Sequence, residues 1–293
     1  MKKSLWLSFL FVLFFIACGD DSSTSANNSD VGGGSSKNND NSAKSSASVG
    51  VVTSSSNKIC QEFEVGSETL EATVGSMTDP RDGQTYKTVT LDKQVCSAED
   101  SKTFRRFTVS TQVWMAQNLN YETANSYCYN DDVTNCSKYG RLYTWGAAID
   151  SLYILRAAGE NCGLDRNCSL KGPVRGVCPD GWRLPSEYDW RIMFGNVGGK
   201  SKASKALKST LGWTFKGNSM NGTDTFSFSA LPAGYRLENG NYVNEGTAAR
   251  FWSITMSIHN SVYSLNLFYT DEASDLDDSG YMSFAFSVRC IKY

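Results

Sequence analysis

The chain has 293 residues, of which 28 are Lys or Arg and 30 are Asp or Glu, so its formal net charge at pH 7 is −2. This balance excludes nucleic-acid binding through a basic surface, which needs clustered positive charge. The single histidine, His259, excludes metal sites built from several histidines and most schemes with an imidazole base. Nine cysteines are typical of a protein that folds in an oxidising compartment.

The N-terminus has the features of a bacterial export signal. Lys2 and Lys3 precede an apolar run over residues 5–16, which is too short to span a bilayer as a helix. Residues 15–18, Phe-Ile-Ala-Cys, resemble the lipobox of bacterial lipoproteins, in which the cysteine receives a diacylglycerol and becomes the acylated N-terminus. We therefore expect residues 1–17 to be removed and Cys18 to anchor the protein at the bacterial outer membrane or cell surface. The alternative is an ordinary signal peptide with a coincidental cysteine.

Residues 18–57 predict a disordered tether. They are rich in Ser, Asn, Gly and Asp and contain no aromatic residue, so they cannot bury enough apolar area to offset the entropy of ordering. A coil of about 40 residues has an r.m.s. reach of roughly 35 Å, enough to lift a domain clear of lipid headgroups. Aromatic residues and cysteines then persist over residues 58–293 without a second linker, which predicts one domain.

The first half of this domain predicts strands and then helices. A turn signal at residues 79–83 precedes an alternating strand at 86–91, and residues 113–116 predict another strand. A helix is expected over 144–157, where apolar residues recur at helical spacing at Trp145, Ala148, Ile149, Leu152 and Leu155. Ser186 predicts the N-cap of a second helix, with Asp189 at the reciprocal capping position. A third helix is expected at 201–209, with Ala203, Ala206 and Leu207 inward and Lys202, Lys205 and Lys208 outward.

The C-terminal third predicts two amphipathic strands. In the first, Tyr263, Leu265, Leu267 and Tyr269 alternate with Ser264 and Asn266. In the second, Met282, Phe284, Phe286, Val288 and Cys290 alternate with small or polar residues. Each pattern predicts one buried face. Strands, a helical middle and further strands together predict an α+β fold with antiparallel sheets.

Seven ordered motifs carry a resemblance to a known family. They are DGQTY at 82–86, WMAQNLNY at 114–121, YGRLYTW at 139–145, VCPDGWRLPS at 177–186, FSALPAGYR at 228–236, FWS at 251–253 and FSVRC at 286–290. The series resembles the Fibrobacter succinogenes major paralogous domain over roughly residues 78–293. That family occurs in secreted and lipid-anchored bacterial proteins, and its name implies no activity. Residues 92–111 depart from it, because the family has a shorter turn there.

A second resemblance is more distant. Residues 182–190 are similar to the Arg-Leu-Pro-Thr-x-x-x-Trp element of the formylglycine-generating sulfatase-modifying family, which has a C-type-lectin-like fold. The resemblance implies a C-type-lectin-like core with antiparallel sheets, two or three helices, disulfide staples and paired N- and C-terminal strands. It does not imply the oxidase activity. That activity relies on a cysteine pair near the C-terminal end, whereas Cys290 is the only cysteine after Cys178.

Without Cys18, eight cysteines remain, an even number that can pair fully. Spacing predicts local pairs, and the two remaining cysteines form a long bridge: Cys60–Cys96, Cys128–Cys136, Cys162–Cys168 and Cys178–Cys290. The long bridge resembles the whole-domain disulfide of C-type-lectin-like folds. Zinc is the alternative use of these cysteines, but the sequence contains no Cys-x-x-Cys.

Aromatic rings beside amide side chains suit the faces and hydroxyls of sugars. Candidates near Gly- and Asn-rich loops are Trp213, Tyr235, Asn239, Asn241, Tyr242, Tyr263 and Tyr269. The alternative for each ring is a core position, which we expect outright for Trp145, Trp182, Trp190 and Trp252. An acidic run between two strands suggests a calcium site at Asp271, Asp275 and Asp277, or else a solvated loop.

No residue stands out as catalytic, since there is no Gly-x-Ser-x-Gly elbow and His259 falls in an expected loop. We expect a lipid-anchored envelope module that binds carbohydrate or another surface component and has no cofactor. Its expected partners are the membrane, through the lipid, and a polysaccharide or envelope protein, but no nucleic acid. A structural scaffold with protein partners is the alternative, and an enzyme related to the sulfatase-modifying family is the third hypothesis.

Overall fold

The chain divides into two units, Met1–Val52 and Thr53–Tyr293. The computed structural model describes residues 68–98, 104–159, 161–163, 168, 170, 172–257, 261–269 and 274–293. The predictions for Cys18, the tether, Cys60, His259 and Asp271 lie outside these ranges. Within them, no helix combines the length and the apolar character that a membrane span requires.

The first sheet joins the two ends of the described domain. Its five strands, in the order β1-β2-β3-β15-β6, are all antiparallel to their neighbours. They are β1 (Glu68–Thr78), β2 (Thr85–Ala98), β3 (Phe104–Met115), β6 (Trp182–Arg183) and β15 (Ile291–Lys292). The predicted strand at 86–91 lies within β2. The last strand pairs with β3, with Ile291 opposite Trp114.

The second sheet has the order β13-β12-β11-β9-β14-β5-β4, with β10 paired to β9. Its strands are β4 (Ser126–Tyr127), β5 (Leu142–Thr144), β9 (Ala233–Arg236), β10 (Tyr242–Glu245), β11 (Ala248–Met256), β12 (Val262–Phe268), β13 (Asp275–Gly280) and β14 (Ala285–Ser287). Most pairs are antiparallel, although β11 runs parallel to β9 and β14. A separate hairpin joins β7 (Thr214–Phe215) and β8 (Asn218–Ser219). The mixture of helices with mostly antiparallel sheets confirms the predicted α+β class, although the described residues form five α-helices instead of the two or three expected.

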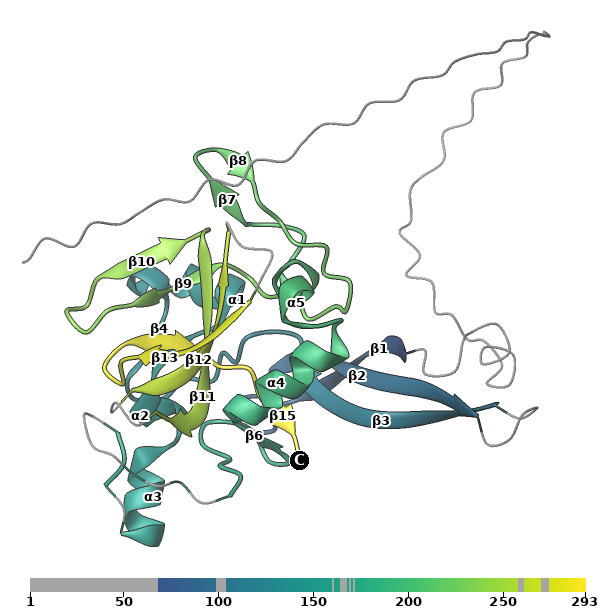
Figure 1. Ribbon diagram of the computed structural model, residues 1–293. Helices are drawn as coiled ribbons and strands as arrows, with labels where there is room; N and C mark the ends of the chain where they lie inside the picture. The colour runs from purple at the N-terminus through teal and green to yellow at the C-terminus, as the bar shows by residue number, and fades with distance from the viewer. Residues whose placement is uncertain are drawn as a thin grey trace, which may run out of the picture. The chain divides into compact units, whose positions relative to one another are not determined.

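Helices cover the sheets. They are α1 (Val133–Tyr139), α2 (Trp145–Ala148), α3 (Ser151–Ala158), α4 (Glu187–Asn196) and α5 (Lys200–Leu207), and the 3-10 turn η2 (Tyr129–Asp131) precedes α1. Helix α4 contacts β2 and β3 of the first sheet and β11 and β12 of the second, so it packs between them (Figure 1). Ser186 and Asp189 form the capping box that the sequence predicts for this helix.

The described core has two large aromatic clusters and a smaller third one around Tyr129 and Tyr139. In the first, Trp114 stacks on Trp190 at 4.4 Å between ring centres. In the second, Trp252 stacks on Phe286 at 4.1 Å, close to Trp145. The four tryptophans assigned to the core are all buried: Trp145, Trp182, Trp190 and Trp252.

The helix expected over 144–157 is broken in the structure. Asp150 adopts a left-handed conformation, with φ of 53°, and its carboxylate accepts the backbone N–H of Tyr153 as the N-cap of α3. An aspartate is favoured at such a cap because its side chain satisfies a free helical N–H. The break rotates the second half away from the core, so Leu152 is 62% exposed and Leu155 42% exposed. Their predicted burial is wrong.

Two further predictions fail because neighbouring layers cover faces expected to meet solvent. Ser264 and Asn266 of β12 are fully buried, since Ser264 lies opposite Trp252 on the side of the second aromatic cluster. Lys208, expected to point outward, is also buried. Its Nζ donates to the carbonyl of Phe268 and lies 5.1 Å from the Trp213 ring centre.

A buried ion pair fixes the start of α4. Both terminal nitrogens of Arg183 donate to the Asp189 carboxylate, at 2.7 and 2.8 Å. Burial alone would raise the pKa of Asp189, but hydrogen bonds from Arg183 and Ser186 lower this pKa below its usual value. Ionised Asp189 therefore stabilises the fold above its unfolded-state pKa of about 3.9, and this contribution is lost as the pH falls through the lower folded-state value.

We expect Asp189→Asn to lower the free energy of unfolding by about 2 kcal/mol at pH 7, because two charge-assisted hydrogen bonds are weakened. Urea unfolding at pH 7 and at pH 3 measures the effect, which should shrink at the lower pH. Asp180→Asn is the matched control, because Asp180 pairs with Arg175 at an exposed position. An equal loss for Asp189→Asn at both pH values would contradict the assignment.

Candidate functional site

A cleft with a volume of about 900 Å³ lies beside the β4 and β5 edge of the second sheet. Its lining comes from Arg81 and from six short segments: 121–127, 144–152, 161–163, 175–177, 236–238 and 282–283. Rings, amides, hydroxyls and charged groups alternate along it. Such a surface suits a polar ligand with apolar faces.

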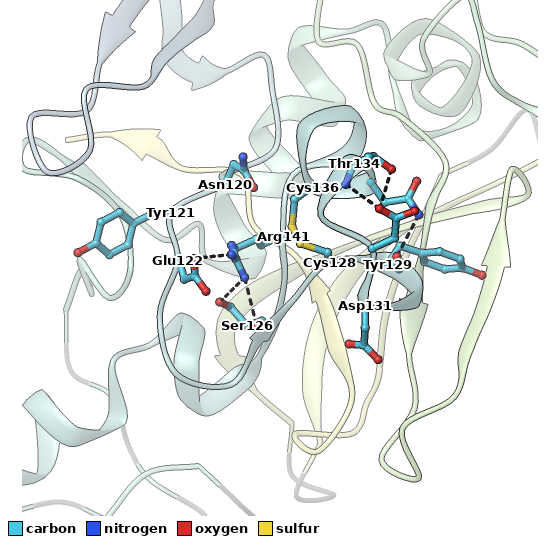
Figure 2. Close-up of a disulfide and its surroundings, with 12 residues drawn as sticks. Asn120, Tyr121, Glu122, Ser126, Cys128, Tyr129, Asp131, Thr134, Cys136 and Arg141 are labelled. Carbon is cyan, nitrogen blue, oxygen red and sulfur yellow. Dashed lines mark hydrogen bonds and ion pairs between the residues drawn. A yellow bond between two sulfur atoms is a disulfide. The ribbon is translucent and has the colours of Figure 1, made fainter.

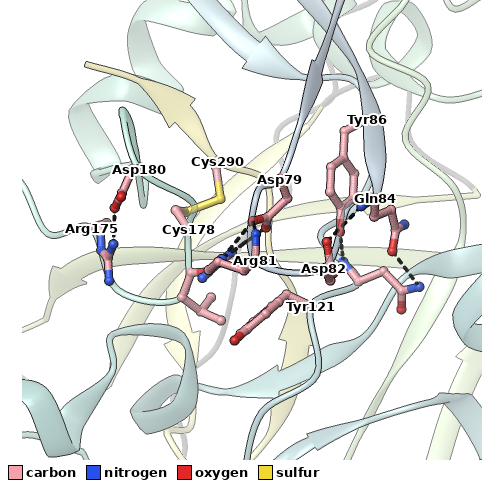
Figure 3. Close-up of polar contacts among 12 residues, drawn as sticks. Asp79, Arg81, Asp82, Gln84, Tyr86, Tyr121, Arg175, Cys178, Asp180 and Cys290 are labelled. Atoms are coloured by element: carbon pink, nitrogen blue, oxygen red, sulfur yellow. Dashed lines mark hydrogen bonds and ion pairs between the residues drawn. A yellow bond between two sulfur atoms is a disulfide. The ribbon is translucent and has the colours of Figure 1, made fainter.

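On one wall of the cleft, Tyr121 lies against Arg81, whose guanidinium is held by hydrogen bonds (Figure 3). Arg81 donates from Nε and Nη2 to the Asp79 carboxylate, at 2.9 and 2.6 Å, and from Nη1 to the carbonyl of Val177 at 2.9 Å. Its guanidinium carbon lies 3.9 Å from the Tyr121 ring centre. Burial would raise the pKa of Asp79, but the hydrogen bonds from Arg81 lower it. Arg81 thus acts as a brace that holds Tyr121 in place.

The other wall carries Tyr127 beneath a second arginine. The guanidinium carbon of Arg236 lies 4.1 Å from the Tyr127 ring centre and 5.7 Å from that of Tyr242. Its Nε is buried and has no hydrogen-bond partner within the described residues. Nearby, Ser283 donates its hydroxyl to Glu238 at 3.0 Å. A cationic side chain stacked on a tyrosine at the cleft suits ligand oxygen atoms.

The loop between these two tyrosines is held rigidly (Figure 2). Arg141 pairs with Glu122 at 2.7 Å and reaches the carbonyl of Ser126 at 3.5 Å. The disulfide Cys128–Cys136 follows directly and closes the turn that leads into α1. The cleft walls are therefore fixed before any ligand binds, which reduces the entropy lost on binding.

Two backbone segments that line the cleft approach each other closely at Gly146 and Gly163. A Cβ atom on Gly163 would lie 3.2 Å from the Cα of Gly146, and Gly163 has φ of 94°, so a side chain at this position is strained. The disulfide Cys162–Cys168 holds the same segment. Cys178 and Cys290 form the long bridge, so three of the four predicted pairs are confirmed. The fourth pair lies partly outside the described residues.

The predicted ligand-binding residues are dispersed. Trp213 is fully buried, and its Nε1 donates to Ser209 and to the carbonyl of Ala230, so it takes the core position that was the alternative for this ring. Tyr269 stacks on Phe215 at 4.0 Å, away from the cleft. Tyr263 is half-buried on β12. None of these three rings lines the cleft.

The remaining candidates lie on β9, β10 and the turn between them. Tyr235 packs beside Phe284 at 6.2 Å, and its hydroxyl accepts from Asn244. Asn239 accepts the backbone N–H of Asn241 within the turn. Tyr242 packs on Tyr129, donates its hydroxyl to Asp131 and reaches the cleft only through Arg236. Burial, together with Asp131, raises the pKa of Tyr242 to about 12.

The cleft residues that sequence reasoning missed are Tyr121, Tyr127, Arg81 and Arg236. Two of them stand inside recognised motifs, Tyr121 at the end of 114–121 and Arg236 at the end of 228–236. Their position at motif ends, next to a loop, is the signal that was available. Nothing local distinguishes Tyr127 from the other tyrosines.

The described part of the acidic run, which begins at residue 274, lies mostly in strand β13 and not in the predicted loop. Asp275 pairs with Lys200 at 3.3 Å. Asp277 accepts from Ser279, and Asp278 accepts from Ser257. Each carboxylate thus has a separate partner. Over the described part of the chain, no group of three acidic, His or Cys side chains is placed to hold a metal.

A comparison with known families finds a match over most of the described domain. The family described as Fibrobacter succinogenes major domain matches residues 108–292, whereas neither a curated protein nor a solved structure matches the chain. The match starts later than residue 78, where the motif series begins, so β1 and β2 precede it. It still spans more than half of the 293 residues and includes six of the seven motifs. The chain therefore belongs to the Fibrobacter succinogenes major domain family.

Proposed function

We propose that the protein is a lipid-anchored module of the bacterial cell envelope that binds carbohydrate in the cleft between Tyr121 and Tyr127. The observation that carries this proposal is that each ring is braced by an arginine on a rigid wall. Tyrosine faces suit the C–H faces of sugar rings, while guanidinium, amide and hydroxyl groups suit their oxygens. A volume of about 900 Å³ accommodates several sugar units.

The anchor and the fold are part of the same proposal. The lipobox resemblance at Cys18 supports attachment at the outer membrane or cell surface, and a tether over 18–57 would give the domain reach. A C-type-lectin-like core is supported by the pairing of β15 with β3 and by the long bridge Cys178–Cys290. The first feature pairs the end of the domain with a strand of its N-terminal part, and the second ties the end to the segment before β6.

A binding assay tests the cleft. The full chain, purified in detergent, is expected to be retained on at least one insoluble plant or bacterial polysaccharide. Tyr127→Ala and Arg236→Ala should each weaken retention about tenfold, which corresponds to about 1.4 kcal/mol, because each variant removes a group that would contact the sugar. Tyr269→Ala is the control, since this ring stacks on Phe215 outside the cleft. Absence of retention on every polysaccharide, or equal loss in the control, would contradict the proposal.

A scaffold role with a protein partner is the second candidate. The observation that favours it is the exposure of Leu152 and Tyr153 on α3, at 62% and 65%. Crosslinking in intact cells separates the two roles. One stoichiometric protein partner without polysaccharide retention would favour the scaffold. Turnover in a formylglycine-forming assay would instead favour the enzyme.

A further inference from the structure

Four of the sequence motifs meet at a second, smaller cavity that the cleft does not include. Nine of its thirteen lining residues belong to the motifs at 82–86, 114–121, 139–145 and 228–236. Only four of the twenty-two residues that line the cleft belong to motifs. The sequence features that define this chain's family resemblance are therefore concentrated at the small cavity.

The walls of this cavity are fixed by Asn118. Its Oδ1 accepts from Nε of the buried Arg289 at 2.6 Å, and its Nδ2 donates to the carbonyl of Tyr139 at 2.7 Å and to Ser287 Oγ at 3.2 Å. Gly140 lies so close that a Cβ atom there would be 2.8 Å from the Cβ of Asn118. Since Asn118 is fully engaged, it shapes the cavity and leaves ligand contacts to its neighbours.

The neighbouring residues offer unused polar groups. Asn120 lines the cavity, and its Oδ1 is buried with no hydrogen-bond partner in the described part of the chain. Its Nδ2 donates only a long bond, of 3.4 Å, to Gln84. A buried acceptor without a partner carries a desolvation cost that a donor group would relieve. A ligand hydroxyl that donated a hydrogen bond to Asn120 Oδ1 would remove this cost.

The charged side chains that line the cavity are both positive. Lys87 and Lys138 both line the cavity, and the described lining contains no acidic side chain. Lys138 lies 3.6 Å from Glu245, which is outside the lining. Lys87 interacts electrostatically with Asp224, which is also outside the lining. Two ammonium groups beside a small polar cavity favour an anionic ligand.

From these contacts we infer that the cavity binds one hydroxylated carboxylate of the size of a single sugar ring, of the hexuronic acid class. The hydroxyl meets Asn120 and the carboxylate meets the two lysines. The cavity volume of about 180 Å³ sets the size, since a cavity of roughly 150 Å³ accepts one benzene ring. This site is independent of the cleft and does not rest on the carbohydrate proposal above.

Calorimetric titration of the full chain in detergent with D-galacturonate tests the inference. Saturable binding is expected, at least tenfold tighter than binding of D-galactose, which lacks the carboxylate, and of acetate, which lacks the hydroxyls. Lys87→Ala and Asn120→Ala should each weaken galacturonate binding about tenfold. Lys202→Ala, which changes an exposed lysine on α5, should leave binding unchanged.

Near-ultraviolet circular dichroism confirms that each variant is folded, and Lys87 is exposed, so its replacement preserves the core. Three results would overturn the inference: no saturable galacturonate binding, equal binding of galactose, or unchanged binding by folded Lys87→Ala and Asn120→Ala. Failure of polysaccharide retention with intact galacturonate binding would contradict the cleft alone.

Discussion

Replacing Cys290 by serine is expected to lower the free energy of unfolding by about 2–5 kcal/mol. Cys178 and Cys290 are both fully buried, and their bond spans 112 residues of sequence (Figure 3). The bond constrains the unfolded chain, and chain-entropy estimates for a loop of this length reach about 4–5 kcal/mol. The bond also connects the residues just before β6 to those just before β15. These two strands pair with each other in the first sheet.

Urea unfolding followed by tryptophan fluorescence measures this loss. Cys178→Ser, Cys290→Ser and the double variant should lose similar amounts, because each removes the same bond. The control is the double variant of Cys128 and Cys136, whose separation of 8 residues predicts a smaller loss of about 2–3 kcal/mol. Losses at Cys178 and Cys290 that add in the double variant would show that the two sulfurs contribute separately, contrary to the structure.

Replacing Arg289 by methionine is expected to cost about 3–5 kcal/mol of stability. The arginine is fully buried, and its guanidinium donates to Asn118 Oδ1 and to the carbonyls of Met115, Phe228 and Ser229. Methionine fills similar space but leaves these acceptors without donors, at roughly 1–3 kcal/mol for each group that water cannot reach. The loss is limited by relief of the buried charge, since burial lowers the pKa of Arg289 to about 9.

The same urea experiment checks this value. Arg289→Lys should also lose stability, because one ammonium group cannot reach four acceptors held in a fork geometry. Arg191→Met is the control, since Arg191 pairs with Glu187 on the exposed face of α4, where such pairs contribute about 0–1 kcal/mol. A loss at Arg289 no larger than the loss at Arg191 would contradict the role of Arg289 as a buried donor.

Local patterns predicted some elements and missed others. The strand expected over 282–290 is only β14 (Ala285–Ser287), and the helix expected over 144–157 is broken at Asp150. Ser186 and Asp189 specify the start of α4 by themselves, because a capping box involves residues three apart. Short cysteine spacings predicted two loop disulfides for the same reason. Arg289 shows the limit of such patterns. Alternation along 282–290 predicts a solvent-facing arginine, but distant segments at 115–118 and 228–229 enclose it.

The cleft could not be predicted from the sequence for a similar reason. Its rings and arginines come from residues 81, 121, 127 and 236. Tyr127 and Arg236 are brought together by the pairing of β5 with β4 and β14 and of β14 with β9. Arg81, in contrast, is held by the carbonyl of Val177 and lies against Tyr121. Neighbouring sequence does not reveal that Trp213 is enclosed while Tyr127 lines a cleft. The tertiary surroundings of each ring decide its exposure, although the residues next to Trp213 and Tyr127 are similarly polar.

The measurement that tests the carbohydrate proposal most directly is hydrogen–deuterium exchange of the full chain with a soluble oligosaccharide from a retained polysaccharide. Binding in the cleft predicts slower exchange in peptides covering 121–127, 144–152 and 236–238, and no change in the β7–β8 hairpin at 214–219. Unchanged exchange in the cleft peptides under saturating ligand, or protection confined to other segments, would contradict it.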